Sequence, residues 1–207
     1  VGKYLDEVPA RWKALTLRQL LTHTSGVPDY EAAAGYDVYE TSPTPQQVFA
    51  IVAKQPLDFK PGTDWKYSNT GYFLISLVVE RVSGQHLGAY LNERIFGPLG
   101  MRHTYMSGYG PADVPRAQGC KSSAPGELRI AVPPISEAST MGAGGIVSTL
   151  QDWAIWDAAL DGERVLSRRA MAQVFAPAVA IPNVKGVMYG FGIGMGEIAG
   201  VRRQGHS

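Results

Sequence analysis

Apolar residues recur at helical spacing in several segments of the chain, and polar residues or glycine close each segment. The most hydrophobic segment covers residues 72–79 and is followed by Ser83 and Gly84, a pair typical of a helix C-terminus. The pattern predicts a buried helix that opens at residues 66–71 and ends near Val82. Shorter helices are predicted at residues 16–21, 44–55, 87–95, 148–160 and 168–176.

Capping motifs mark the first turns of two of these helices. Thr16 with Gln19, and Thr44 with Gln47, form capping boxes, in which the side chain of each residue bonds the backbone N–H of the other. Pro45 then occupies the first helical position, where a missing N–H costs nothing. Helices are therefore predicted to start directly after Thr16 and Thr44.

The spacing of apolar residues changes near the end of the chain. Residues 189–196 alternate large and small side chains, as a strand does, and residues 201–206 can pair with them across a turn at residues 199–200. The chain therefore reads as mainly helical over residues 1–180, followed by strands over residues 187–207. Because an isolated hairpin is marginally stable, these strands require a sheet that the sequence does not visibly supply.

Two segments lack any periodicity. Residues 28–42 are rich in turn formers and aromatic residues, and they are predicted as a surface excursion. Residues 108–134 contain five prolines and few apolar anchors, and they are predicted as a long irregular connection. Neither segment contains an internal repeat.

Composition and charge exclude several classes of protein. The 207 residues suffice for one domain, and 45% apolar with 18% charged residues is typical of a globular protein. The net charge of +1, with no basic run longer than an arginine pair, gives no reason to expect a nucleic-acid partner. The longest apolar run is far shorter than the ~20 residues of a membrane span. Cys120 is the only cysteine, which excludes an internal disulfide and a cysteine-rich metal cluster.

The sequence contains no convincing motif for a metal or a cofactor. The histidines His23, His86, His103 and His206 have no ligand spacing and read as ordinary polar residues. Residues 194–199 match the loose G-x-G-x-x-A form of a dinucleotide loop, but a strand rather than a helix is predicted after them. We therefore expect neither a metal nor a cofactor.

Candidate chemistry lies at Tyr67, Ser68 and Asn69, the polar triplet at the mouth of the most hydrophobic helix. A phenol can act as a general base when nearby cations lower its pKa from about 10. An amide such as that of Asn69 both donates and accepts, so it can orient a substrate amide. The same residues also fit a structural role, in which Ser68 or Asn69 caps the helix below a packed Tyr67, and residue types alone favour that simpler interpretation.

No serine nucleophile is recognisable from a local motif. The sequence has no G-x-S-x-G, and no serine is followed by lysine three residues later. The nearest pattern, Thr63-Asp64-Trp65-Lys66, begins with threonine in a predicted loop. A Ser-Lys pair works by placing an amine beside the hydroxyl on adjacent helical turns, and this chain has no such pair.

Several segments in a fixed order resemble the serine hydrolases of the β-lactamase-related type. That group includes class C β-lactamases, D-alanyl-D-alanine carboxypeptidases, D-aminopeptidases and esterases. The resemblance covers nearly the whole chain and rests on the set of segments, since each alone is weak. The segments are Leu20-Leu21-Thr22-His23-Thr24-Ser25-Gly26, Pro61-Gly62, Tyr67-Ser68-Asn69-Thr70-Gly71-Tyr72, Glu80-Arg81-Val82-Ser83-Gly84, Ile95-Phe96-Gly97-Pro98-Leu99-Gly100-Met101, Gly142-Ala143-Gly144-Gly145-Ile146-Val147-Ser148-Thr149 and Gly205-His206-Ser207.

The resemblance implies an α+β fold of the β-lactamase/transpeptidase type, with the active site in a cleft between a helical part and an antiparallel sheet. This chain would supply mainly the helical part and a C-terminal hairpin of the sheet. Three motifs carry the site in that family: Ser-x-x-Lys, Tyr-x-Asn, and Lys or His-x-Gly on a strand. By this pattern Tyr67 is the general acid/base and Asn69 the substrate-orienting amide, while His206 and Ser207 begin the third motif, which binds substrate near the oxyanion site.

The implied reaction is hydrolysis of an ester or amide through a serine acyl-enzyme. Implied substrates are small-molecule esters, D-amino-acid peptides or β-lactams, with His206 favouring the first two, and a periplasmic or secreted location is favoured. The chain departs from the pattern, because the Ser-x-x-Lys motif expected before Val1 is absent and the third motif stops at Ser207. We therefore expect residues 1–207 to be a partial domain that is inactive alone. The alternative is a non-catalytic relative that serves as a binding or regulatory module.

Overall fold

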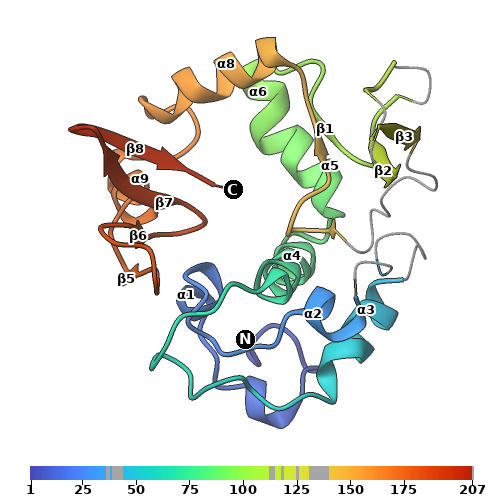
Figure 1. Cartoon of the computed structure of the whole chain (residues 1–207), viewed down its shortest axis with the longest axis vertical. Coiled ribbons are helices and arrows are strands. Elements are labelled where there is room, and N and C mark those ends of the chain that lie inside the picture. Colours follow the sequence, from blue (N-terminus) through green and yellow to red (C-terminus); the bar gives the residue numbers. More distant parts are fainter. Residues whose placement is uncertain are drawn as a thin grey trace.

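The computed structural model describes residues 1–35, 38, 44–111, 115–117, 119–124, 126–130 and 140–206. Helices and antiparallel strands are both present in this part of the chain, so the fold is α+β (Figure 1). The helical elements are η1 (Ala10–Trp12), α1 (Leu17–Leu21), α2 (Tyr30–Ala34), α3 (Pro45–Ala53), α4 (Asn69–Ser83), α5 (Leu87–Leu91), the π-helical turn η3 (Asn92–Phe96), α6 (Gly97–Leu99), α8 (Leu150–Leu160) and α9 (Arg168–Val174). The strands are β1 (Tyr105–Met106), β2 (Cys120–Ala124), β3 (Glu127–Ile130), β4 (Ile146–Val147), β5 (Val179–Ala180), β6 (Met188–Tyr189), β7 (Gly194–Ile198) and β8 (Val201–Gly205).

Helix α4 is the centre of the helical part, with α1, α2 and α3 on one side and α5 on the other (Figure 1). Phe73 and Leu74 of this helix are fully buried in a core that also contains Trp12 and Leu20. Gly71 permits α1 to pass closely, because a Cβ at this position would lie 3.2 Å from the Leu20 carbonyl oxygen. The close packing fixes the N-terminus of α4, where the candidate chemistry lies, against α1.

A four-stranded antiparallel sheet, in the order β5-β6-β7-β8, lies on the other side of the molecule (Figure 1). The predicted hairpin turn at residues 199–200 is confirmed between β7 and β8, in which Gly194 pairs with Gly205. The single strand predicted over residues 189–196 is wrong, because β6 ends at Tyr189 and pairs with β7, which begins at Gly194. The two-residue turn of the hairpin uses Ala199 and Gly200 with φ of 51° and 80°, as a type I′ turn requires. The expectation that the chain holds only this hairpin of the sheet is wrong. Strands β5 and β6 extend the sheet, and with two residues each they are too short to produce an alternating pattern.

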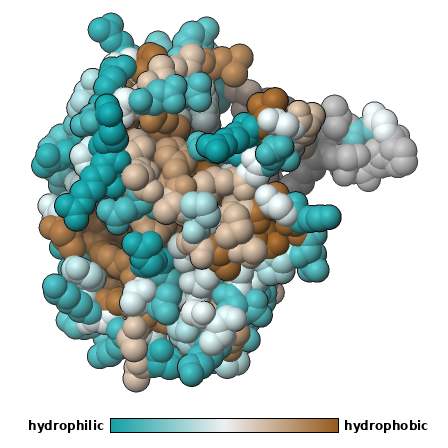
Figure 2. All heavy atoms as spheres, turned by 90° about the vertical axis from the view of Figure 1, so that its left-hand side faces the viewer, coloured by the Kyte–Doolittle hydropathy of each residue, from teal (hydrophilic) through white to brown (hydrophobic). Residues whose placement is uncertain are grey.

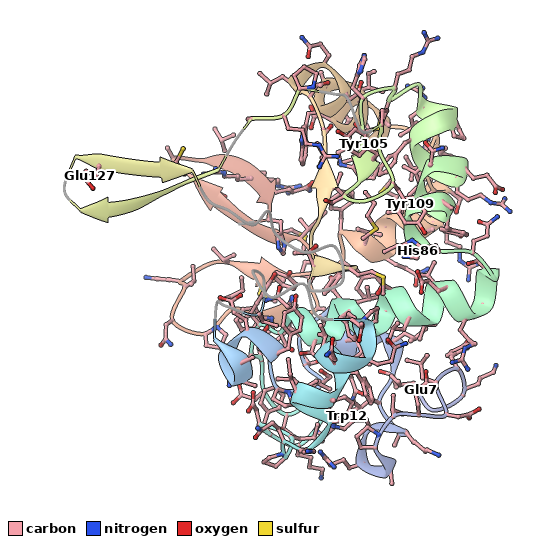
Figure 3. All side chains as sticks on the ribbon, turned by 90° about the vertical axis from the view of Figure 1, so that its right-hand side faces the viewer. Glu7, Trp12, His86, Tyr105, Tyr109 and Glu127 are labelled. Atoms are coloured by element: carbon pink, nitrogen blue, oxygen red, sulfur yellow. The ribbon has the colours of Figure 1, made fainter. Side chains whose placement is uncertain are left out.

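Both segments predicted to be irregular contain regular structure. Within residues 28–42, Asp29 caps helix α2, and Tyr30 is fully buried. Within residues 108–134, strands β2 and β3 form a hairpin that projects from the body of the molecule (Figure 3). In each case a local polar cap or a cross-strand pairing outweighs the absence of an apolar period.

Helix α8 is attached to the strand region by a buried carboxylate. Thr149 caps this helix, and Asp152 in its first turn is only 3% exposed. Asp152 Oδ2 accepts hydrogen bonds of 2.8 Å from the backbone N–H of His103 and from the hydroxyl of Thr104. A second apolar core lies next to this contact, formed by Phe96, Leu99, Met101 and Ala159.

Candidate active site

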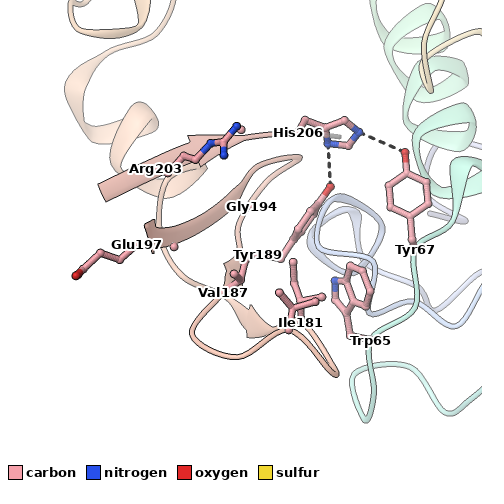
Figure 4. Close-up of a pocket in the computed structure, with 12 residues that line it drawn as sticks. Trp65, Tyr67, Ile181, Val187, Tyr189, Gly194, Glu197, Arg203 and His206 are labelled. Atoms are coloured by element: carbon pink, nitrogen blue, oxygen red, sulfur yellow. Dashed lines mark hydrogen bonds between the residues drawn. The ribbon is translucent and has the colours of Figure 1, made fainter. Parts of the chain in front are cut away.

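Tyr67 and His206 meet in space, although 139 positions separate them in the sequence. The Tyr67 hydroxyl lies 3.4 Å from His206 Nε2, with Tyr67 two residues before the start of α4 and His206 directly after β8 (Figure 4). The two residues were predicted to share a site only through the family resemblance. Of the other predicted residues, Asn69 begins α4, whereas Ser207 lies outside the described residues.

The loop that carries Tyr67 is held by the turn that follows α1. The Lys66 N–H donates to the His23 carbonyl at 3.1 Å, and the Ser68 N–H donates to His23 Nδ1 at 3.2 Å. Lys66 Nζ forms an ion pair of 2.7 Å with Asp58 within the same loop. Tyr67 is therefore bracketed by two backbone anchors, both of which depend on His23.

His23 occupies the middle of an aromatic cluster and is 1% exposed. Its ring centroid lies 4.4 Å from that of Tyr67, 5.0 Å from that of Tyr189 and 5.3 Å from that of Tyr72. Burial, and then the nearby charge of His206, lower the pKa of His23 from 6.5 to about 4. His23 is therefore neutral at pH 7, and its Nε2 lies 3.1 Å from the Tyr189 hydroxyl.

His206 is oriented by the segment between β6 and β7. Its Nδ1 lies 2.9 Å from the Gly192 carbonyl oxygen and 3.3 Å from the Tyr189 hydroxyl. Gly192 has φ of 76°, and a Cβ there would lie 2.8 Å from the Tyr72 hydroxyl, so glycine is required at this position. The Tyr72 hydroxyl itself donates to the Leu21 carbonyl at 2.8 Å.

The phenols of the cluster are held in their protonated form. The pKa of Tyr67 is raised by burial and, to a smaller extent, by the negative charges of Asp29 and Glu31. Burial likewise raises the pKa values of Tyr72 and Tyr189. The base role predicted for Tyr67 requires nearby cations that lower its pKa. The described residues produce the opposite shift, so this part of the chain does not by itself meet that condition.

Asn69 is positioned through its backbone by Asp29. Asp29 Oδ2 accepts the Asn69 N–H at 2.5 Å, and Asp29 Oδ1 accepts the Glu31 N–H at 2.7 Å. The Ser68 side chain makes no capping hydrogen bond, and its hydroxyl is buried without a partner in the described structure. A capping role for the Ser68 side chain is therefore wrong, because Asp29 from another segment supplies the acceptor.

Two cavities share the wall formed by Tyr67 and His206. The first, of about 480 Å³, lies between the sheet and the loop before α4 (Figure 4). The exposed side chains of Glu197 and Arg203 stand beside it. Most of its other lining side chains are apolar or aromatic: Trp65, Ile181, Val184, Val187 and Tyr189.

The second cavity, of about 450 Å³, lies between α4, α5 and the glycine turn at residues 142–144. Its lining is strongly apolar and includes Ile75, Val79, Leu87, Leu91, Met106 and Ile146. Figure 2, drawn from the side of the sheet and α8, shows apolar surface in the middle of this face between hydrophilic margins. Tyr67 and His206 therefore place two polar groups on a largely apolar hollow.

Sequence reasoning missed His23, Tyr189 and Asp29 as members of this site. His23 was included only as part of a resembling segment, and the four histidines were interpreted as ordinary polar residues without ligand spacing. Tyr189 joins His23 to His206, so two of these four histidines lie within one network. A non-glycine residue with positive φ, here 56° at His23, is a signal of such a constrained position, but it is visible only in the structure.

The structure also bears on the metal site, the dinucleotide loop and the membrane span considered from the sequence. Among the described residues, no group of three or more His, Cys, Asp or Glu side chains could hold a metal ion. Residues 194–199 form β7 and its turn and lead into β8, so the helix that a dinucleotide loop needs is not there. No helix in the described ranges is long and apolar enough to cross a membrane.

Comparison with known proteins connects this geometry to a family. The chain is 29% identical over 206 residues to penicillin-binding protein 4* of Bacillus subtilis, which covers 93% of this chain and 45% of that protein. It is 31% identical over 221 residues to a D-aminopeptidase of Brucella anthropi, covering 100% of this chain and 38% of that protein. The chain thus spans less than half the length of both relatives.

The three-dimensional comparison agrees. A D-stereospecific amidohydrolase from Streptomyces sp. superposes with a TM-score of 0.85 and 27% identity, covering 99% of this chain and 65% of that one. Both structures therefore have the β-lactamase/transpeptidase-like fold that the resemblance predicted. The sequence profile described as Beta-lactamase matches residues 1–200. The chain therefore belongs to the Beta-lactamase family.

Proposed function

We propose that the protein containing this chain is a serine hydrolase that cleaves an ester or amide through an acyl-enzyme, with Tyr67, Asn69 and His206 in its active site. The observation that carries the proposal is the contact of 3.4 Å between the Tyr67 hydroxyl and His206 Nε2 on a wall shared by two cavities. Tyr67 would transfer the proton between nucleophile and leaving group, and Asn69 would orient the substrate carbonyl group.

The nucleophile must come from a Ser-x-x-Lys motif, which these 207 residues do not contain. In the proposed reaction the serine oxygen attacks the carbonyl carbon, Tyr67 carries the serine proton to the leaving group, and water then hydrolyses the ester. The lysine ammonium of the motif would stand near Tyr67. A cation there would offset the effect of burial and of Asp29, which raise the Tyr67 pKa.

The apolar cavity between α4 and α5 offers a place for a helix that carries this motif. Its lining of Ile75, Val79, Leu87 and Leu91 would bury an apolar helix face, and Tyr67 stands at its edge. The chain spans only 45% of penicillin-binding protein 4* and 65% of the Streptomyces amidohydrolase. These proteins therefore have room for such a helix outside the region that matches this chain.

The substrate class we favour is the amide or peptide of a D-amino acid, with simple esters as alternative substrates. Two relatives are named for D-stereospecific hydrolysis: the Brucella D-aminopeptidase and the Streptomyces amidohydrolase. The cavity of about 480 Å³ beside Tyr67 has the apolar lining that a hydrophobic side chain would need.

The test measures hydrolysis of p-nitrophenyl acetate, of D- and L-phenylalanine p-nitroanilide and of a chromogenic cephalosporin by the full-length protein. We expect turnover of the ester and preference for the D-anilide, both reduced at least 1,000-fold by Tyr67→Phe and unchanged by Tyr90→Phe on α5. Turnover by residues 1–207 alone would contradict the need for the Ser-x-x-Lys motif. If the full-length sequence lacks this motif and the full-length protein shows no turnover, the result would favour the alternative, a binding or regulatory module.

A further inference from the structure

We infer that His23 and Tyr189 form a positioning pair for His206, which holds His206 Nε2 unprotonated and directed at the Tyr67 hydroxyl. The inference rests on the proposed function for its catalytic meaning. The arrangement itself follows from hydrogen-bond chemistry, because two backbone groups fix which ring nitrogen of His23 and which of His206 carries the proton.

The first backbone group is the Ser68 N–H, which can only donate. It lies 3.2 Å from His23 Nδ1, so Nδ1 is the acceptor, and the neutral His23 ring carries its proton on Nε2. The Nε2–H then donates to the Tyr189 hydroxyl oxygen at 3.1 Å. The Tyr189 oxygen is thereby held at one point, with a second lone pair still available.

The second backbone group is the Gly192 carbonyl, which can only accept. It lies 2.9 Å from His206 Nδ1, so Nδ1 carries the proton, and the Tyr189 oxygen at 3.3 Å is a second acceptor for the same N–H. In its neutral form His206 therefore presents a lone pair at Nε2. The Tyr67 hydroxyl, 3.4 Å from this nitrogen, is the donor.

The arrangement predicts that His206 adopts the Nδ1–H tautomer. This tautomer is uncommon, because a free neutral imidazole side chain prefers its proton on Nε2. His23 suits the positioning role because it is buried and rigid: it is 1% exposed, packs against three tyrosine rings and is held in the left-handed region of φ. A surface side chain could not hold the Tyr189 oxygen at a fixed point. The Tyr189 oxygen, in turn, gives the His206 Nδ1–H a second acceptor beside the Gly192 carbonyl.

The test that does not depend on activity is the tautomer of His206 in the full-length protein, read from ¹⁵N chemical shifts of labelled histidine. We expect the Nδ1–H form in the wild type and a detectable Nε2–H form in Tyr189→Phe. Tyr72→Phe is the matched control, because it also removes a hydroxyl from a ring beside His23. The Tyr72 hydroxyl bonds the Leu21 carbonyl instead of a histidine. An Nε2–H tautomer in the wild type, or an unchanged His206 spectrum in Tyr189→Phe, overturns the inference.

The kinetic test separates positioning from packing. Tyr189→Phe should lower kcat about five- to tenfold with KM unchanged, the loss expected from one hydrogen bond that matters in the transition state. His23→Leu should lower kcat further. His23→Gln keeps a side-chain N–H donor, so its kcat should be higher than that of His23→Leu even where the two variants have the same unfolding midpoint. Equal kcat values for His23→Gln and His23→Leu would contradict a positioning role.

The inference and the proposed function can fail separately. In one outcome, Tyr67→Phe abolishes turnover, whereas Tyr189→Phe changes neither turnover nor the His206 spectrum. This outcome would reject the positioning pair and support the hydrolase. A protein without hydrolase activity, in which only Tyr189→Phe alters the His206 tautomer, would keep the pair and reject the hydrolase.

Discussion

Asp29 and Asn69 are joined by a hydrogen bond of 2.5 Å from the Asn69 backbone N–H to Asp29 Oδ2, across 40 positions of sequence. The same carboxylate caps α2 through the N–H groups of Glu31 and Ala32. One buried side chain, 8% exposed, therefore fixes the start of two helices at once. It also places a negative charge near Tyr67, which contributes to the raised pKa of that phenol.

Replacing Asp29 should separate these two effects. Asp29→Ala removes three backbone partners and should lower the free energy of unfolding by about 2 kcal/mol. Asp29→Asn keeps an acceptor and should cost less than half of that, but it removes the charge, so the Tyr67 pKa should fall relative to the wild type. Urea unfolding measures the first effect. NMR titration of ¹³Cζ-labelled tyrosine measures the second, with Tyr67→Phe to assign the signal. A Tyr67 pKa that is unchanged in Asp29→Asn contradicts the electrostatic coupling.

The pKa of His23 predicts a loss of stability in mild acid. The folded-state value of about 4 lies below the ordinary 6.5, so the unfolded state binds a proton in this range that the folded state excludes. The contribution to the free energy of unfolding is complete above pH 6.5 and is lost as the pH falls towards 4, by about 3 kcal/mol in total.

Urea unfolding at pH 7, 5.5 and 4 checks this slope. His23→Gln should be less stable at pH 7 but should lose less stability on acidification. Substituting the exposed His103 by Gln is the control and should leave the slope as in the wild type. A His23→Gln variant with the wild-type slope would show that another group is responsible.

The glycine turn beside the second cavity should tolerate no side chain at Gly142. Its φ is 76°, and a Cβ would collide with the backbone carbonyl of Tyr72 and lie 2.8 Å from Ser76 Cβ. Gly84 is the matched control, because it has φ of 68° but open space around its Cβ position. We expect thermal unfolding to show that Gly84→Ala costs about 1 kcal/mol and Gly142→Ala at least about 3 kcal/mol. Equal costs would mean that the turn can move away from α4.

Asp152 should be more important for stability than its place on a surface helix suggests. Asp152→Ala leaves the His103 N–H without its acceptor and the Thr104 hydroxyl with only the Ser148 hydroxyl, 2.7 Å away, which should cost about 3 kcal/mol. Asp157→Ala, on the exposed side of the same helix, should cost less than about 0.5 kcal/mol. Chemical denaturation of both variants compares them directly, and similar costs would contradict the proposed anchoring of α8.

Local signals in the sequence predicted the elements that depend on local chemistry. The capping boxes at Thr16 and Thr44 are confirmed with both reciprocal hydrogen bonds, and α4 ends where Gly84 takes φ of 68°. The turn of the β7–β8 hairpin is likewise at Ala199 and Gly200, where it was predicted. In each of these elements the deciding contacts lie within a few residues of one another.

The rest of the fold and site depends on partners that are far apart in sequence. Helix α2 forms because Asp29 supplies its cap and Tyr30 finds a core, and neither contact produces a period in the sequence. The partner of His23 is Tyr189, 166 positions away, so no spacing rule could have joined them. Tyr67 and His206 were paired only because their segments resemble a known family.

The contact between Tyr67 and His206 also carries a kinetic consequence. It closes a loop of 139 residues, and the entropic cost of closing a loop grows with its length. The packing of α4 against α1 and α5 joins segments that are much nearer in sequence, and contacts of shorter range form faster. The helical part should therefore acquire its structure first. The site would be completed only when the sheet docks, and it would be the first feature to disappear when the sheet detaches.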